Sequence, residues 1–407
     1  MDESSGAVTQ ASPRTPSASE VLWAFLRLGL TSFGGPVAHI GYFRDEFVVR
    51  RRWLDEHAYA DLVALCQFLP GPASSQVGLS IGLLRAGYAG ALAAWVGFTL
   101  PSALALTLFA YGVGAAGGAL GGGWLHGLKL AAVAVVAQAV LGMMRSLAPD
   151  RERATLALAA TIFTIVVPTV WGQVGAIVAG GIVGLIWLRG GAMANDSALP
   201  IDVSRTVAIG ALTLFLVLLI GVPWMATESG SQTLILFDAF YRSGSLVFGG
   251  GHVVLPLLKA AVVSPGWVSD DAFLAGYGAA QAVPGPLFTF AAYLGAMMRP
   301  QPNGWIGALI ALVGIFLPSF LLVIGVLPFW QTLRRRASAQ AALRGVNAAV
   351  VGLLLAALYN PVWTSGVTSA ADFAVASAAF LLLFMWRTPP WLVVILCAIA
   401  GEAMGTL

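Results

Sequence analysis

The stretch Phe25-Leu26-Arg27-Leu28-Gly29, followed shortly by Phe33-Gly34-Gly35, occurs twice in this chain of 407 residues. Its second copy is Phe240-Tyr241-Arg242-Ser243-Gly244, followed by Phe248-Gly249-Gly250, at an offset of 215 residues. Because order and spacing are kept within each copy, a duplication explains the pattern better than chance does. We therefore expect two related halves, each built around a glycine motif.

Two further motifs follow in both halves, in the same order. Gln67-Phe68-Leu69-Pro70-Gly71-Pro72 corresponds to Gln281-Ala282-Val283-Pro284-Gly285-Pro286. A Pro-Ser pair then closes each copy, at Pro101-Ser102 and Pro318-Ser319. In a membrane protein, repeats that contain interrupted apolar segments are typical of transporters whose substrate site lies where the two halves meet.

The composition indicates a membrane protein. Hydrophobic residues make up 58% of the chain and charged residues 10%, far from the balance of a soluble globular domain. We predict an all-α polytopic membrane protein with two inverted-topology repeats, broken or re-entrant helices and roughly 9–13 membrane spans. The net charge of +3 comes without a basic arm, so we do not expect nucleic acid as a partner.

We divide the chain into four regions. Residues 1–18 are expected to be a disordered tail, 19–190 the first repeat, 191–232 a linker with one extra transmembrane helix, and 233–407 the second repeat. Six hydrophobic stretches in each repeat and one in the linker would make the second repeat enter the membrane from the opposite side. We expect a multi-pass membrane protein, and the sequence leaves a homodimer open.

The distribution of arginine tests this topology. Under simple alternation most arginine clusters, including Arg334-Arg335-Arg336, fall on one side of the membrane, as the positive-inside rule requires. Arg50-Arg51-Arg52 fall on the other side unless the first two stretches of each half are re-entrant hairpins. We favour hairpins over broken spanning helices, and both interpretations stay open.

We place substrate binding at the glycine and proline breaks. Non-helical backbone at membrane depth is tolerated only where it is buried in protein or lines a wet cavity. A half-helix that begins there directs free N–H groups and a partial positive charge at the cavity, which suits an anion. The alternative is that the breaks are only kinks that let helices pack closely. The predicted binding residues at the breaks are Gly34, Gly35, Pro36, Pro70, Gly71, Pro72, Ser74, Ser75, Gly249, Gly250, Pro284, Gly285, Pro286 and Thr289.

Four polar residues within the apolar stretches complete the predicted binding set. Arg27 and Arg242 carry guanidinium groups, whose planar fork suits a tetrahedral oxyanion. The alternatives are snorkelling to the interface and, for Arg242, an ion pair with Asp238 four residues earlier. Gln67 and Gln281 either donate amide hydrogens to the ligand or satisfy carbonyl groups freed by the following proline.

Asp61 and His39 are candidates for proton coupling. Asp61 is otherwise interfacial, and a satisfied core histidine is the favoured interpretation of His39. The sequence contains no nucleotide-binding G-x-x-x-x-G-K-[ST] motif and no H-E-x-x-H motif, and its histidines and cysteines are scattered. We therefore expect no cofactor, no metal and transport driven by an ion gradient or the membrane potential.

Several of these motifs together resemble the chromate ion transporter (CHR) family, in its long, two-domain bacterial form. They are Phe33-Gly34-Gly35-Pro36, Trp53-Leu54, Gln67-x-x-Pro70-Gly71-Pro72 and Phe98-x-Leu100-Pro101-Ser102. The resemblance covers nearly the whole chain. It implies export of chromate from the cytoplasm across the inner membrane, chromate resistance and coupling to the proton-motive force. The family motif residues fall on Arg27, Gly34, Gly35, Pro36, Pro70, Gly71 and Pro72 and on their counterparts in the second half.

The second copy departs from the first. Gly251 replaces the proline of Gly-Gly-Pro, and Leu287-Phe288 replace Ala73-Ser74, so we expect the first half to carry more of the binding. Sulfate or another tetrahedral oxyanion is the alternative substrate, because helix ends and arginines alone do not separate it from chromate. A lipid scramblase or an intramembrane enzyme is a remote alternative. A nucleophile–base pair of Ser74 or Ser75 with His39 has no motif support, so we expect no enzyme.

Overall fold

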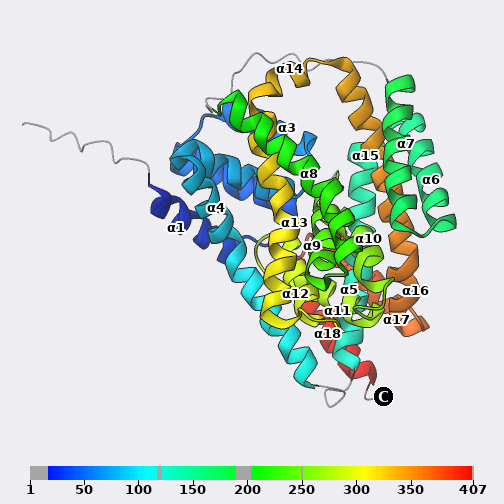
Figure 1. Cartoon of the computed structure of the whole chain (residues 1–407). Helices are drawn as coiled ribbons and strands as arrows, with labels where there is room; N and C mark the ends of the chain where they lie inside the picture. The colour runs from blue at the N-terminus through cyan, green and yellow to red at the C-terminus, as the bar shows by residue number, and fades with distance from the viewer. Residues whose placement is uncertain (1–16, 117–121, 189–202, 249–250, 406–407) are drawn as a thin grey trace, which may run out of the picture.

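The computed structural model describes residues 17–116, 122–188, 203–248 and 251–405. All regular elements in these ranges are helices (Figure 1), and five helices are long and apolar enough to cross a membrane. These five are α4, α5, α8, α13 and α15, the last two with their continuations. The predicted all-α polytopic membrane fold is confirmed.

The first half is formed by helices in the residues that the structure describes. They are α1 (Ala18–Thr31), α2 (Gly35–Arg44), η1 (Asp45–Arg50), α3 (Glu56–Phe68), α4 (Ala73–Ala116), α5 (Gly123–Leu147), α6 (Arg151–Val166) and α7 (Val170–Trp187). The extra helix of the linker is α8 (Arg205–Ser229), which packs against α9 and α13.

The second half repeats this order. Its elements are α9 (Gln232–Ser245), η2 (Gly251–Val253), α10 (Val254–Leu258), η3 (Lys259–Val263), α11 (Asp270–Ala282), η4 (Leu287–Thr289), α12 (Phe290–Met297), α13 (Gly304–Val326), η5 (Leu327–Phe329), α14 (Trp330–Arg334), α15 (Ala337–Ala357), η6 (Leu358–Trp363), α16 (Thr364–Gly366), α17 (Ala370–Phe384) and α18 (Pro390–Gly405).

The glycine and proline motifs end short helices, as predicted. α1 has 14 residues and is therefore about 21 Å long, too short for a hydrocarbon core of about 30 Å. α2, α3, α9 and α11 are equally short or shorter. α4 is continuous by hydrogen bonding but kinks at Ala86 and Gly87, where Gly87 has φ +63°. At the equivalent place the second half breaks completely, between α12 and α13.

The duplicated motif glycines let equivalent helices cross closely. α1 packs on α4, and α9 packs on α13. A Cβ at Gly29 would lie 2.7 Å from the carbonyl oxygen of Gly97, and one at Gly244 would lie 2.2 Å from that of Ile315. These positions are therefore small because two backbones meet there, which is the usual way membrane helices associate.

The last helices of each half pack against the other half. α5 lies against α17 and α18, while α15 lies against α6 and α7. Figure 1 shows α6 and α7 beside α15. A Cβ at Gly127 on α5 would lie 2.0 Å from the carbonyl oxygen of Cys397, and one at Gly345 on α15 would lie 2.0 Å from that of Gly180. The two halves are thus interlocked through matching glycine contacts.

Equivalent short helices lie at opposite ends of the bundle. α3 lies near α14, where Trp330 Nε1 donates to Asp61 Oδ1 at 3.2 Å, and α11 begins near the start of α5, where Lys129 Nζ lies 2.9 Å from Asp271 Oδ1. Figure 1 shows α3 and α14 in its upper part and α11 and α18 in its lower part.

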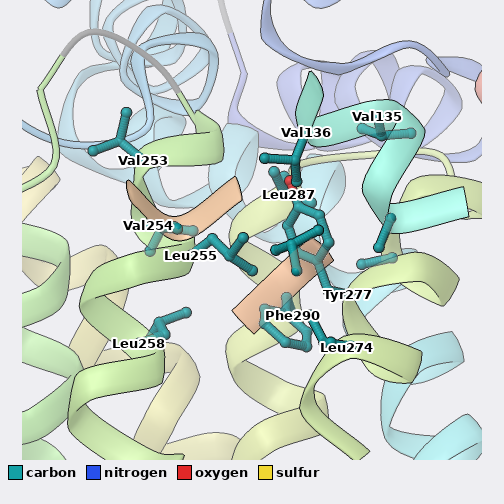
Figure 2. Packing of buried hydrophobic residues seen from close by; sticks show 14 of the residues in the cluster. Val135, Val136, Val253, Val254, Leu255, Leu258, Leu274, Tyr277, Leu287 and Phe290 are labelled. Atoms are coloured by element: carbon teal, nitrogen blue, oxygen red, sulfur yellow. The ribbon is translucent and has the colours of Figure 1, made fainter. Parts of the chain in front are cut away.

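The largest apolar cluster includes Val247 and Val253, which flank the second glycine motif in the sequence. Val253, Val254, Leu255 and Leu258 belong to this cluster together with side chains of the segment that runs from α11 to α12, and Figure 2 labels members of both groups. Those labelled from this segment are Leu274, Tyr277, Leu287 and Phe290, all buried. Residues 251–258 are therefore anchored by apolar packing.

Candidate substrate site at the crossed turns

Four turns meet between the two halves, and we name them by their residues. The first glycine turn is 32–36, the first proline turn is 70–72 and the second proline turn is 284–286, while the second glycine turn is described only at its flanks, Val247, Phe248 and Gly251. Gly34 and Gly35 have φ +99° and +77°, and Gly71 and Gly285 have φ +121° and +104°. Glycine adopts these left-handed conformations without the penalty that a side chain brings, so the turns depend on it.

Pro36 lies in the first turn of α2, as predicted, where its missing N–H removes no helical hydrogen bond. Pro72 and Pro286 lie immediately before α4 and η4. Gln76 holds the first proline turn together: its Nε2 donates to the Pro70 carbonyl at 2.7 Å and its N–H to the Pro72 carbonyl at 2.9 Å. Sequence reasoning missed Gln76, because the second half has no matching residue.

Each proline turn is hydrogen-bonded to the glycine turn of the other half. The Gly71 N–H donates to the Val247 carbonyl at 2.6 Å, and the Gly285 N–H donates to the Ser32 carbonyl at 2.9 Å. Val247 and Ser32 occupy equivalent positions, so the two bonds are reciprocal. Each contributes about 0.5–1.5 kcal/mol. In this conformation both N–H groups serve the protein and do not face a ligand.

The two Pro-Ser motifs lie under the proline turns of the opposite half. A Cβ at Gly71 would lie 2.8 Å from Ser319 Oγ, and one at Gly285 would lie 2.8 Å from Ser102 Oγ. Both serines are 1% exposed. The repeat of the Pro-Ser pair was the sequence signal for this contact, but the sequence did not say which turn each serine meets.

Pro36 and Gly251 are equivalent residues, and they meet. A Cβ at Gly251 would lie 3.1 Å from Pro36 Cγ. Atoms this close leave no space for a second ring, because protein interiors are packed at the density of organic crystals. The missing proline of the second copy is therefore explained by contact with the proline of the first.

A small pocket lies between the first glycine turn and the second proline turn. Its lining residues are Gly34, Gly35, Ala280, Gln281, Val283, Gly285, Leu287 and Pro390. The space inside accommodates about one water molecule. A tetrahedral anion with four oxygens is larger, so the turns have to separate before one can enter.

Buried polar atoms without a hydrogen-bond partner gather around the crossed turns. Among the residues that the structure describes, fourteen side-chain atoms are buried without a hydrogen-bond partner, and six of them belong to residues in or beside the turns: Ser32 Oγ, Ser75 Oγ, Gln76 Oε1, Thr99 Oγ1, Gln281 Nε2 and Ser319 Oγ. Such atoms are rare in protein interiors because each costs about 1–3 kcal/mol. Their concentration at one place indicates a region that takes a polar ligand or water.

His39 and Ser74 form a polar contact behind the first glycine turn. His39 is 1% exposed; its Nε2 lies 3.2 Å from the Ser32 carbonyl and its Nδ1 lies 3.4 Å from Ser74 Oγ. A neutral imidazole that donates to the carbonyl and accepts from the hydroxyl satisfies both nitrogens. This is the arrangement of a core histidine.

The structure does not gather the other predicted residues at the turns. Arg27 is exposed on α1 on the same face as Trp23 and Leu30, and Gln67 is exposed at the end of α3. Arg242 is paired with Asp238, the alternative that the sequence had left open.

The remaining predicted residues have mixed positions. Thr289 is buried and its hydroxyl donates to the Pro286 carbonyl at 2.7 Å, while Asp61 is buried beside Trp330. The second glycine turn includes Gly249 and Gly250, which lie outside the described residues.

The long apolar helices, the two related halves and the turns buried between them define a multi-pass membrane protein of the transporter class. The profile of the chromate transporter family matches residues 19–185 and 234–402, so the chain belongs to the chromate transporter family. This membership implies an oxyanion substrate.

Curated relatives agree over nearly the full length. The chain is 29% identical over 404 residues to the chromate transport protein of Pseudomonas aeruginosa, covering 98% of this chain and 94% of that one. It is 25% identical over 397 residues to the probable chromate transport protein of Synechococcus elongatus, covering 93% of each. No solved structure matches this chain.

Proposed function

We propose that this protein exports chromate from the cytoplasm across the bacterial inner membrane, driven by the proton-motive force, and so confers chromate resistance. The observation that carries the proposal is the reciprocal crossing of turns at Gly71 and Gly285, beside a pocket and a group of partnerless polar atoms. The curated relatives named for chromate transport support the choice of substrate.

Neutral donors from both halves would bind the anion. The N–H groups at the start of α2 and the amide of Gln281 lie at the pocket, and Ser75 is buried near the first proline turn. The start of a helix favours negative charge. Arg27 lies one helical turn before the end of α1, where an exposed guanidinium would attract the dianion before it reaches the turns.

The transport cycle follows from the reciprocal bonds. Separating the first proline turn from Val247 would open one side of the site, and separating the second from Ser32 would open the other. The positions of α3 and α11 at opposite ends of the bundle support an inverted arrangement of the two halves. Asp61, buried and hydrogen-bonded to Trp330 across the two halves, is our candidate for proton coupling in preference to His39.

Uptake of labelled chromate into everted vesicles tests the proposal, because export becomes accumulation there. We expect uptake that requires an imposed proton gradient and that collapses with an uncoupler. Strong competition by sulfate, together with uptake of labelled sulfate, would make sulfate the substrate. Lipid exchange between leaflets without oxyanion flux would instead favour a scramblase.

The hairpin topology has its own test. A cysteine-accessibility scan across residues 43–53 in intact cells should give labelling only after permeabilisation, since hairpins place this segment in the cytoplasm. The native Cys66 and Cys397 are buried, so they contribute little background. Labelling from the periplasm would contradict the hairpins and favour broken spanning helices.

A further inference from the structure

The serines of the two Pro-Ser motifs are not among the donors that the proposed function assigns to the anion. Ser102 lies on α4 and Ser319 on α13, both 1% exposed. Each lies within a long helix that also contains the preceding proline. Because each serine lies inside its helix, neither of them caps a helix end.

Each hydroxyl group faces one of the two proline turns that the proposed transport cycle has to move. Ser319 Oγ would be 2.8 Å from a Cβ at Gly71, and Ser102 Oγ would be 2.8 Å from a Cβ at Gly285. When a proline turn withdraws from its partner half, the hydroxyl beneath it becomes the nearest polar group of the newly exposed wall.

The two hydroxyls differ in their present bonding. Ser102 Oγ donates to the Thr99 carbonyl at 3.1 Å, within its own helix. Ser319 Oγ has no hydrogen-bond partner in the part of the chain that the structure describes. A buried hydroxyl without a partner is unfavourable, so one that persists calls for a partner present in another state of the molecule.

We propose that Ser319 and Ser102 are substrate-binding residues, whose hydroxyl groups donate to oxygens of the oxyanion once the opposite proline turn moves off them. The proposal rests on the transport function proposed above. A hydroxyl is a neutral donor, so it adds a hydrogen bond to a dianion without adding a buried charge. The free hydroxyl of Ser319 is the stronger contributor, because that of Ser102 must first leave Thr99.

Uptake kinetics in everted vesicles test this proposal through three variants. Ser319→Ala should raise the KM for chromate about tenfold and the sulfate inhibition constant in parallel, with Vmax within about twofold, because a hydrogen bond to an ion is worth this much. Ser102→Ala should raise KM about threefold. Ser319→Cys keeps the shape of the side chain but is a weak donor, so its KM should rise almost as far as that of Ser319→Ala.

Thr164→Val is the control, since Thr164 is buried and donates to Ala160 within α6, away from the turns. It should leave KM unchanged. If vesicles that contain the wild-type protein take up neither chromate nor sulfate, the proposed function itself is wrong. With an active wild type, an unchanged KM in Ser319→Ala overturns the binding role and leaves water as the partner of the hydroxyl. A normal KM in Ser319→Cys would reduce Ser319 to a packing residue. So would a lower Vmax with an unchanged KM in Ser319→Ala.

Discussion

The two glycine turns occupy equivalent places but have different surroundings. Behind the first, His39 contacts both the Ser32 carbonyl and the Ser74 hydroxyl. Behind the second lie the apolar side chains that Figure 2 shows, and its one histidine, His252, contacts Tyr277 OH at 2.6 Å. The difference teaches that the duplicated turns have diverged: one kept polar groups beside the site, and the other became part of the packed core.

The contact between Pro36 and Gly251 gives this divergence a physical cause. Where two equivalent positions meet, an identical pair of proline rings would overlap. One copy had to lose its ring. The two halves therefore cannot have the same residue at the contact between Pro36 and Gly251. Matched substitutions in the two halves measure how far their functions differ.

The largest effects should come from Gly71→Ala and Gly285→Ala. Each new Cβ would approach a serine Oγ to 2.8 Å in a backbone of strongly positive φ, which alone costs about 1–3 kcal/mol. We expect both variants to lose chromate uptake in everted vesicles by at least about a hundredfold, because each reciprocal bond is broken.

Gly266→Ala is the control for these two, because Gly266 has φ +79° but open space around it. It should retain uptake. If Gly71→Ala is inactive and Gly285→Ala is active, only the first proline turn moves in transport, and the reciprocal cycle proposed above is wrong.

The next largest effect separates the two arginines. Arg27→Ala should abolish most uptake, at least about tenfold, with normal membrane insertion, since Arg27 is exposed and supports no fold contact in the described structure. Arg242→Ala should instead reduce the amount of inserted protein, because it leaves the buried Asp238 carboxylate without its cation.

Immunoblots of membranes, together with vesicle uptake, distinguish the two outcomes. The double variant Arg242→Ala with Asp238→Ala should recover insertion. Normal flux in Arg27→Ala would make Arg27 a snorkelling residue. A poorly inserted Arg27→Ala, or a double variant no better than Arg242→Ala, would contradict the division between a binding and a structural arginine.

A smaller effect tests the meeting of Pro36 with Gly251. Gly251→Pro should lower uptake severalfold by pushing the two rings together, and Pro36→Gly in the same chain should restore part of it. The single variant Pro36→Gly is the matched reference. If the double variant Gly251→Pro with Pro36→Gly transports as well as the wild type, one proline ring is enough and it can stand in either half. If Gly251→Pro alone is fully active, the packing explanation for the divergence fails.

Much of the fold followed from the sequence, because hydrophobic length and helix breakers are local properties. The breaks at both motifs and the pair of Arg242 with Asp238 depend on residues within four positions of each other. The sequence did not predict that α17 and α18 pack on α5 of the first half, or that α6 and α7 pack on α15 of the second half. Small residues such as Gly127 and Gly345 indicate that a helix crosses another closely but not which helix it meets.

The candidate site followed only in part, for the same reason. The glycines and prolines of the turns were predicted because their backbone requirements are visible in the sequence. Ser102 and Ser319 were visible as a repeated pair, yet their position under the opposite turn depends on how the halves interlock. Ser32 and Gln76 have no counterpart of the same type in the other half, so no repeat pointed to them.

The smallest expected effect compares two equivalent helix starts outside the site. Asp150 caps α6 by accepting from the Arg153 N–H at 2.9 Å, and Ser369 caps α17 by accepting from the Asp372 N–H at 3.1 Å. Hydrogen bonds from Arg153 hold the pKa of Asp150 below its usual range. A carboxyl whose pKa is lowered by folding stabilises the protein above its unfolded pKa, near 3.9, and loses that contribution as pH falls through the folded value.

Asp150→Ala should therefore lower Tm of the detergent-solubilised protein by about 1–2 °C at pH 7, corresponding to about 1 kcal/mol for a lost cap. The difference from wild type should shrink as the pH falls below 4. Ser369→Ala should lower Tm by a similar amount, but the serine hydroxyl does not titrate in this range, so its deficit should persist further into acid. If the loss of Tm varies with pH in the same way for both variants, the ion pair with Arg153 adds nothing to the cap. These two helix starts, unlike the glycine turns, would then have kept the same function since the duplication.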